Sequence, residues 1–184
     1  MKNTALILVD IQNDYFPKGR KELYETNKAA VNARKILDLF RSEHLPVFFI
    51  QHISLGPDAS FFSPGTVGIT IHETVKPYED EPVIVKHFPN SFRETSLLEN
   101  LRSADIENVV ICGMMSHMCI DATTRAAADY GFNCTVIEDA CTSPDLTFKG
   151  RTISAVDVHA VFMAALSGTY ATVETIDAFL QRRR

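Results

Sequence analysis

The repeated alternation of strand-like and helix-like segments constrains the fold of this chain more than any other feature. Short apolar runs of strand length recur, and most of them are separated by segments with apolar residues at helical spacing. The predicted strands cover residues 4–12, 47–53, 82–87, 108–115, 133–141 and 171–176, and the predicted helices cover 28–44, 95–106, 119–131 and 151–168, followed by a terminal helical turn. This alternation predicts one α/β domain over residues 1–184, with a mainly parallel six-stranded sheet and helices on both faces.

Length and charge narrow the possible functions. A chain of 184 residues suits a single core, and its formal net charge of -5 gives no basic face for nucleic acid. The terminal sequence QRRR is the one basic cluster, and we interpret it as a solvated tail. No apolar stretch has the length to span a bilayer, so we expect no membrane association.

The four cysteines have no spacing typical of a metal site or a redox pair. Cys112 and Cys134 lie in apolar runs and are expected to be buried thiols that pack as small hydrophobes. This usage favours a reducing, cytoplasmic location.

An acid, a base and a thiol lie at predicted strand ends. Asp10 ends the first strand, Lys86 ends the third, and Cys119 follows the fourth at the predicted start of a helix. Ligands of parallel α/β sheets gather beyond the carboxyl ends of the strands, so these side chains are expected to converge. We expect the helix terminus and Lys86 to lower the pKa of the Cys119 thiol, with Asp10 accepting its proton.

Such a thiolate would attack a carbonyl and form a thioester, while backbone N–H groups near residues 115–119 hold the developing oxyanion. Each residue also has a simpler interpretation. Aspartate at a strand end often forms a turn, lysine after a strand is usually solvated, and cysteine near a helix start usually fills the core. The coincidence of all three at one edge favours the catalytic interpretation.

Three stretches carry a resemblance to a known family: LILVDIQNDYF, VIVKHFPNSF and VVICGMMSHMCIDATTRAAADYGF. With them the chain resembles the isochorismatase-like cysteine hydrolases, which include nicotinamidases, carbamoylsarcosine amidohydrolases and isochorismatases. The resemblance implies a Rossmann-like three-layer α/β/α sandwich and an Asp10-Lys86-Cys119 catalytic triad. It also implies a cis peptide bond at Met114-Met115, oxyanion contacts from the N–H groups of Met115 and Cys119, and a homo-oligomer.

The resemblance also bears on metal binding. Nicotinamidases of this family bind a metal through an Asp-x-His pair after the second strand, but here Ile50 stands at the aspartate position before His52. His72 lies farther along, and two histidines without a carboxylate make a poor site. We therefore expect no metal and no cofactor. His52 is expected to line the pocket or fix a loop, with an ordinary core histidine as the alternative.

The segments around the triad supply candidate substrate contacts. Hydrogen bonds are expected from polar side chains and an apolar wall from phenylalanines, although core packing is the alternative for the latter. These candidates are Gln12, Asn13, His52, His117, Phe16, Phe88 and Phe92. Arg125, on the helix after Cys119, is expected to form a structural salt bridge.

The resulting hypothesis is a metal-independent cysteine hydrolase that cleaves a non-peptide C–N bond of a small molecule, such as an amide, a lactam or a ureide. One alternative is an isochorismatase-type hydrolase that cleaves a vinyl ether by acid catalysis. A second alternative is a binding or redox-sensing protein that uses a reactive thiol.

Overall fold

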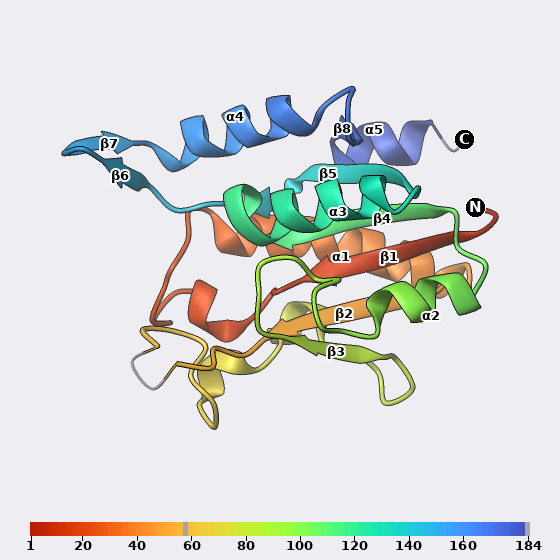
Figure 1. Ribbon diagram of the computed structural model, residues 1–184, viewed down its shortest axis with the longest axis horizontal. Coiled ribbons are helices and arrows are strands. Elements are labelled where there is room, and N and C mark those ends of the chain that lie inside the picture. Colours follow the sequence, from red (N-terminus) through yellow and green to blue (C-terminus); the bar gives the residue numbers. More distant parts are fainter. Residues whose placement is uncertain (57–58, 183–184) are drawn as a thin grey trace.

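A computed structural model describes residues 1–56 and 59–182 and contains one six-stranded sheet (Figure 1). The strands lie in the order β3-β2-β1-β4-β5-β8, and every neighbouring pair is parallel. Their bounds are β1 Thr4–Val9, β2 Val47–His52, β3 Val83–Lys86, β4 Asn108–Met114, β5 Asn133–Thr142 and β8 Thr172–Glu174. The predicted parallel sheet is confirmed. Strand order reverses between β1 and β4, which makes their carboxyl ends the topological switch point.

Helices cover both faces of the sheet, as predicted. Their bounds are α1 Thr26–Ser42, α2 Leu97–Ser103, α3 Asp121–Asp129, α4 Ala155–Leu166 and α5 Ile176–Gln181. Helix α1 contacts β5 and α5 behind the sheet, whereas α3 contacts β5 and α4 in front of it (Figure 1). All six residues of β1 are buried, because this strand lies in the middle of the sheet with both faces covered.

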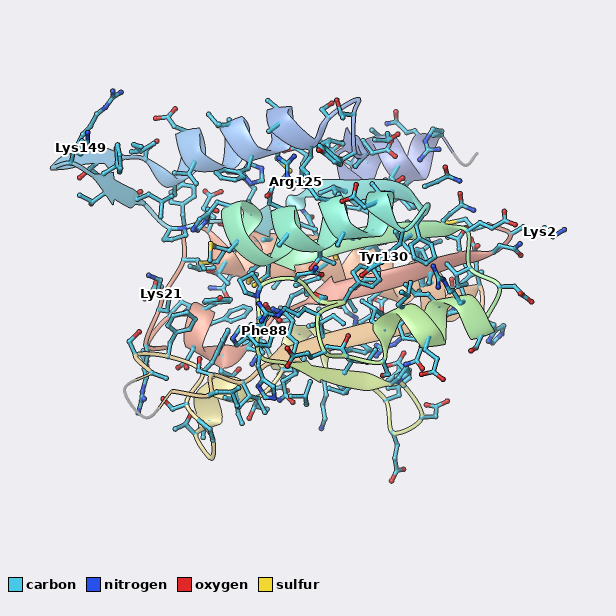
Figure 2. The ribbon with its side chains drawn as sticks, viewed as in Figure 1. Lys2, Lys21, Phe88, Arg125, Tyr130 and Lys149 are labelled. Carbon is cyan, nitrogen blue, oxygen red and sulfur yellow. The ribbon has the colours of Figure 1, made fainter. Side chains whose placement is uncertain are left out.

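The predicted helix over residues 151–168 is wrong at its beginning. Strands β6 (Leu146–Phe148) and β7 (Arg151–Ile153) form an antiparallel hairpin, and α4 begins only at Ala155. Lys149 and Gly150 have φ values of 49° and 77°, the left-handed pair that a tight hairpin turn requires. Ser154 then caps α4 by accepting a hydrogen bond from the Asp157 N–H. Figure 2 shows Lys149 at the far end of this projecting hairpin.

Gly113 allows β1 and β4 to approach closely at the switch point. Its φ is 127°, and a Cβ atom at this position would overlap the carbonyl oxygen of Val9. The register between β4 and β5 also shifts between Ile111 and Gly113. A residue with a side chain would push β1 and β4 apart just before Asp10, so this glycine sets the spacing of the site.

The long segment between β2 and β3 contains two short 3-10 turns, Val67–Ile69 and Glu73–Val75. Pro57 of this segment, and Arg183 and Arg184 of the predicted basic tail, lie outside the described residues. Among the described helices, none combines the length and the apolar character needed to cross a bilayer.

Candidate active site

Asp10, Lys86 and Cys119 meet at the edge of the sheet where the carboxyl ends of β1, β3 and β4 lie. Cys119 belongs to a turn of π-helix formed by Ser116–Ile120, here called the cysteine turn. Lys86 Nζ lies 2.7 Å from Asp10 Oδ2 and 3.1 Å from Cys119 Sγ. Asp10 and Lys86 are fully buried, and Cys119 is 4% exposed. The structure therefore brings together three residues separated by most of the chain.

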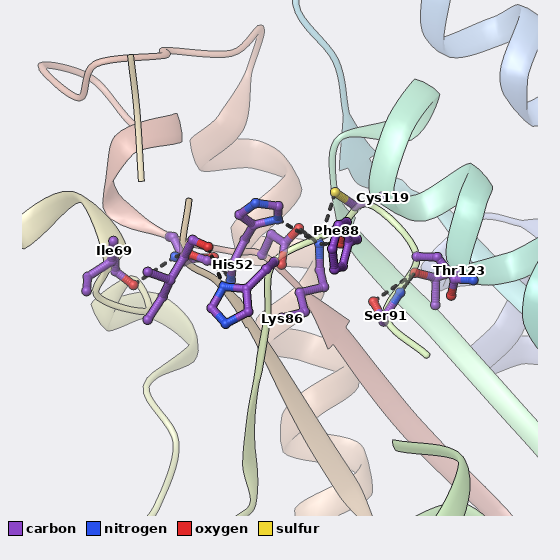
Figure 3. A network of polar contacts seen from close by, with 12 residues as sticks. His52, Ile69, Lys86, Phe88, Ser91, Cys119 and Thr123 are labelled. Atoms are coloured by element: carbon purple, nitrogen blue, oxygen red, sulfur yellow. Dashed lines mark hydrogen bonds and ion pairs between the residues drawn. The ribbon is translucent and has the colours of Figure 1, made fainter. Parts of the chain in front are cut away.

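The ammonium group of Lys86 has more acceptors than protons. Besides Asp10 and Cys119, it donates to the Phe88 carbonyl at 3.1 Å and lies 3.1 Å from His52 Nδ1 (Figure 3). A lysine has three N–H donors, so these four partners hold the ammonium in one place without leaving a proton unused. Lys86 is the centre of the cluster rather than a solvated strand end.

The carboxylate of Asp10 has one oxygen available. Oδ2 forms the ion pair with Lys86, whereas Oδ1 is buried without a hydrogen-bond partner among the described residues. The carboxylate also lies within 4.8 Å of Cys119 Sγ. The backbone of Asp10 has a φ of 52°, a left-handed conformation that aspartate tolerates better than most residues, and this turns the chain sharply after β1. A buried acceptor is therefore placed beside the thiol.

The pKa of Cys119 differs from the sequence expectation. Burial and the Asp10 carboxylate raise the pKa of this thiol above its usual range, and the opposing effect of Lys86 does not compensate. The pKa of Lys86 is also raised: burial acts to lower it, but Asp10 and Cys119 outweigh burial. The expected lowering of the thiol pKa is wrong. The Asp10 carboxylate already neutralises the Lys86 ammonium, so a thiolate at Cys119 would be a buried charge without an opposite charge of its own. The resting site holds a carboxylate, an ammonium and a neutral thiol.

His52 is neutral and belongs to the cluster. Burial lowers the pKa of His52 to about 4, against the effect of Asp10 and with that of Lys86. A neutral imidazole that accepts from Lys86 at Nδ1 carries its proton on Nε2. Asp10, His52 and Cys119 offer atoms close enough together for a metal ion, but the Lys86 ammonium lies within 3.1 Å of all three. The cation that these groups hold is the lysine.

Comparisons with known proteins show the family to which this chain belongs. The sequence matches the Isochorismatase domain family over residues 4–177. The isochorismatase family protein YddQ of Bacillus subtilis is 53% identical over 97% of this chain and 99% of its own length. The chain belongs to the isochorismatase family.

Two solved structures of the isochorismatase fold extend the comparison. An isochorismatase hydrolase from Oleispira antarctica has 46% identity and a TM-score of 0.94, with 98% of each chain covered. The N-carbamoylsarcosine amidase from Thermoplasma acidophilum has 25% identity and a TM-score of 0.81, with 95% of this chain and 96% of that chain covered. The chain thus spans nearly the whole length of both isochorismatase relatives.

The peptide bond between Met114 and Met115 is cis, as the family resemblance implies. The Met115 carbonyl accepts hydrogen bonds from the N–H groups of Met118 and Ile120, which closes the cysteine turn. Cys119 thus lies inside this turn, and α3 begins two residues later, at Asp121. The prediction that Cys119 opens the α-helix is therefore wrong by two residues. The proposed oxyanion contacts of Met115 and Cys119 stay a prediction.

Some predicted substrate contacts lie beside the triad in this isochorismatase fold. The Phe88 backbone holds Lys86, and its half-buried ring lies under the guanidinium of Arg93 at 3.6 Å. The buried amide of Gln12 is occupied by backbone groups, since it donates to the carbonyls of His52 and Ile69 and accepts from the His52 N–H. Gln12 therefore positions the end of β2.

Other predicted contacts are turned elsewhere. Phe16 stacks on His72 at 3.5 Å, and Asn13 donates to the Val67 carbonyl. Phe92 packs against Tyr130 and Phe132, which is the core alternative considered for these phenylalanines. His117 Nδ1 lies 2.9 Å from Ser143 Oγ. Their roles as substrate contacts stay predictions.

Arg125 forms the expected structural salt bridge, with its Nε 2.9 Å from Asp121 Oδ1. All four cysteines are free and buried, so the expected packing role of Cys112 and Cys134 is confirmed.

Sequence reasoning missed several residues that shape the site. Tyr15 is buried, and burial, with Cys119 and Asp10 adding to the effect, raises the pKa of its phenol. The Asp14 carboxylate accepts from the Phe62 N–H at 2.6 Å and fixes the segment after β2. Both residues lie in the quoted stretch LILVDIQNDYF, but nothing in their spacing indicated these long-range contacts.

A second missed contact holds the segment that follows β3. Ser91 Oγ lies 2.8 Å from Thr123 Oγ1, and both residues are fully buried (Figure 3). The Ser91 N–H donates to the same hydroxyl. This pair ties the segment containing Phe88 to α3, just after the cysteine turn.

Proposed function

We propose that this isochorismatase-family protein is a metal-independent cysteine hydrolase that cleaves a non-peptide C–N bond of a small molecule. The observation that carries the proposal is the position of Lys86, which contacts the Asp10 carboxylate and the Cys119 sulfur at once. Within residues 1–56 and 59–182, Asp10 Oδ1 has no hydrogen-bond partner. A nucleophile, a proton acceptor and a fixed positive charge are thereby supplied within one buried cluster.

The raised pKa of Cys119 favours a concerted first step. The sulfur bonds to the substrate carbonyl carbon while the thiol proton passes to Asp10, and the electron pair of the C=O bond moves onto oxygen. The tetrahedral intermediate then expels the amine, which takes the proton back from Asp10, and a thioester on Cys119 remains. Water activated by Asp10 hydrolyses the thioester and restores the thiol.

The type of bond is supported by a relative. The N-carbamoylsarcosine amidase from Thermoplasma acidophilum, which shares 25% identity over 95% of this chain, is named for cleaving a C–N bond. We propose a small substrate because Cys119 is only 4% exposed and Phe88, whose carbonyl accepts from Lys86, lies beside it (Figure 3). We therefore propose amides, lactams and ureides as the substrate class.

Two observations oppose a redox-sensing role. A sensor thiol is exposed and has a lowered pKa. Burial instead raises the pKa of Cys119, and the residue is nearly closed to solvent. A hydrolytic role needs the thiolate only during the attack, so the same observations are compatible with it.

The test uses purified protein and a panel of small amides, lactams and ureides, with ammonia or amine release as the measurement. We expect turnover of at least one compound, loss of turnover in Cys119→Ala, and an acyl adduct on Cys119 by intact-protein mass spectrometry after rapid quenching. Cys134→Ala is the matched control, because it removes another buried thiol from outside the cluster and should retain the activity. A Cys119→Ala variant that works at the full rate would overturn the thioester mechanism, and isochorismate turnover by that variant would favour acid cleavage of a vinyl ether.

A homo-oligomer is also proposed, and α4 supports it. This helix has a single acidic residue and no lysine or arginine, yet Val156 and Val161 are 56% and 63% exposed on its outer side. A helix that is apolar on all sides is usually covered, and we propose that a second copy covers this one. Val161→Asp should shift the mass measured by light scattering from oligomer to monomer, and a wild-type protein that is monomeric at high concentration would refute the proposal.

A further inference from the structure

A hydrogen-bonded chain of side chains that does not include Lys86 reaches the first residue of the cysteine turn. Ser116, the first residue of the turn, is fully buried, and its Oγ lies 2.8 Å from His159 Nδ1 on α4. His159 Nε2 in turn lies 3.4 Å from Glu138 Oε2 on β5. Three side chains from three separate elements thus form a line that ends at the residue after Met115.

This line has the residue types of a serine hydrolase triad but the wrong geometry for one. In such triads the serine lies at Nε2 of the histidine and the acid at Nδ1, whereas here the two contacts are reversed. The buried Ser116 hydroxyl also faces the wrong nitrogen, Nδ1, whose partner in such a triad is the acid. The chain therefore does not form a second catalytic centre.

We infer that His159 is a positioning residue for the cysteine turn, which it holds through Ser116 while Glu138 orients its ring. Glu138 has only acceptor atoms, so it favours the tautomer with the proton on Nε2. Nδ1 is then an acceptor, and the Ser116 hydroxyl donates to it. This inference rests on the proposed function only in so far as the turn carries the nucleophile.

The position of Ser116 explains how its hydroxyl can affect the geometry of the candidate site. Ser116 follows the peptide unit of Met115, whose carbonyl accepts the hydrogen bonds that close the turn. Cys119 lies three residues later, and its sulfur must stay 3.1 Å from Lys86 Nζ. A turn released at Ser116 loses the alignment of the sulfur with Lys86 and of the backbone N–H groups with the substrate oxygen. Small displacements of this kind lower the rate of the chemical step more than they weaken binding.

The test compares four variants: Ser116→Ala, His159→Leu, the double variant, and His159→Asn, whose side-chain oxygen replaces the Nδ1 acceptor. We expect each of the first two to lower kcat at least tenfold with KM changed less than threefold. The double variant should be no slower than the slower single variant, since both changes break the same chain. His159→Asn should restore at least a third of the wild-type kcat.

Ser154→Ala is the matched control, because it removes the cap of α4 and so destabilises the same helix without contacting Ser116. It should lower the melting temperature and leave kcat unchanged. The inference is overturned if His159→Leu retains the wild-type kcat, or if Ser154→Ala lowers kcat as much as His159→Leu does. It is also overturned if the fold-loss of kcat in the double variant equals the product of the losses in Ser116→Ala and His159→Leu.

A measurement without substrate separates this inference from the proposed function. Alkylation of Cys119 by iodoacetamide at pH 9, followed by mass spectrometry, reports the alignment of the sulfur with Lys86. We expect the rate to fall at least threefold in Ser116→Ala and His159→Leu, and to recover in His159→Asn. This pattern would support the positioning role even if no compound of the panel were hydrolysed, whereas equal alkylation rates in all variants would contradict it.

Discussion

Replacement of Lys86 by Met tests the buried ion pair at the centre of the site. Methionine fills the volume of the lysine stem, so packing changes little, but the Asp10 carboxylate is left without its cation in a fully buried position. We expect the free energy of unfolding at pH 7 to fall by about 3–5 kcal/mol, the usual result of removing one partner of a buried pair.

The contacts of Lys86 support this magnitude. At the observed 2.7 Å between Nζ and Oδ2, an effective dielectric constant of about 20 gives an attraction of about 6 kcal/mol. The Phe88 carbonyl and His52 Nδ1 also lose their donor, at about 1–3 kcal/mol for each acceptor left unsatisfied. The desolvation cost of the ammonium, which the variant no longer has, offsets several kcal/mol of this loss.

Urea denaturation followed by circular dichroism measures the change, provided that the slope with denaturant stays constant. The double variant Asp10→Asn, Lys86→Met removes both charges and should regain at least half of the lost stability. Arg34→Met is the control: its ion pair with Asp38 has the same 2.7 Å distance but lies about half exposed, so its loss should cost less than about 1 kcal/mol. A cost below about 1 kcal/mol for Lys86→Met, or a double variant no more stable than the single one, would refute the reasoning.

Three further predictions concern the same cluster. Gly113→Ala should lower the free energy of unfolding by at least about 2 kcal/mol and reduce turnover, because its left-handed backbone and the Val9 carbonyl leave no room for a side chain; equal stability in a urea melt would contradict this. His52 should take up its proton near pH 4 in an NMR titration. Since an unfolded histidine is protonated below about pH 6.5, the contribution of neutral His52 to stability should decrease as the pH falls from about 6.5 to 4. A midpoint above 6 would show that burial does not keep the ring neutral. Because the pKa of Cys119 is raised, its alkylation rate in the free protein should still increase with pH above 9, and a plateau below pH 7 would show a resting thiolate.

Periodicity indicates the fold well where tertiary context agrees with local preference. The apolar runs that became β1, β2 and β4 are buried on both faces and begin within one residue of the predicted positions. The hairpin was missed because its three-residue strands are too short to show alternation, and the Lys149–Gly150 turn carries a weak signal. Sequence reasoning also placed the beginning of a helix at Cys119, because a π-helical turn has nearly the same apolar spacing as the first turn of an α-helix.

The sequence indicates which residues meet at the candidate site, but it does not indicate the direction in which their charges shift the pKa of the thiol. Strand ends and the family resemblance together indicate Asp10, Lys86 and Cys119. The direction of the Cys119 pKa shift depends on burial and on which anions lie beside the Lys86 ammonium. No sequence pattern shows which groups these are. Long-range contacts such as Ser91 with Thr123, or Ser116 with His159, join residues more than 30 positions apart. No local sequence pattern predicts them.

The charge balance of the cluster explains how a thiol with a raised pKa suits the proposed reaction. At rest the buried charges are the Asp10 carboxylate and the Lys86 ammonium, at 2.7 Å. When sulfur attacks and its proton passes to Asp10, the negative charge moves to the substrate oxygen, and one buried cation still faces one anion. When the amine leaves with that proton, the charge returns to Asp10. A permanent thiolate would instead place two anions beside one lysine, at a desolvation cost that burial makes large. In the proposed reaction, Lys86 therefore keeps each stage electrically neutral, rather than ionising the thiol in advance.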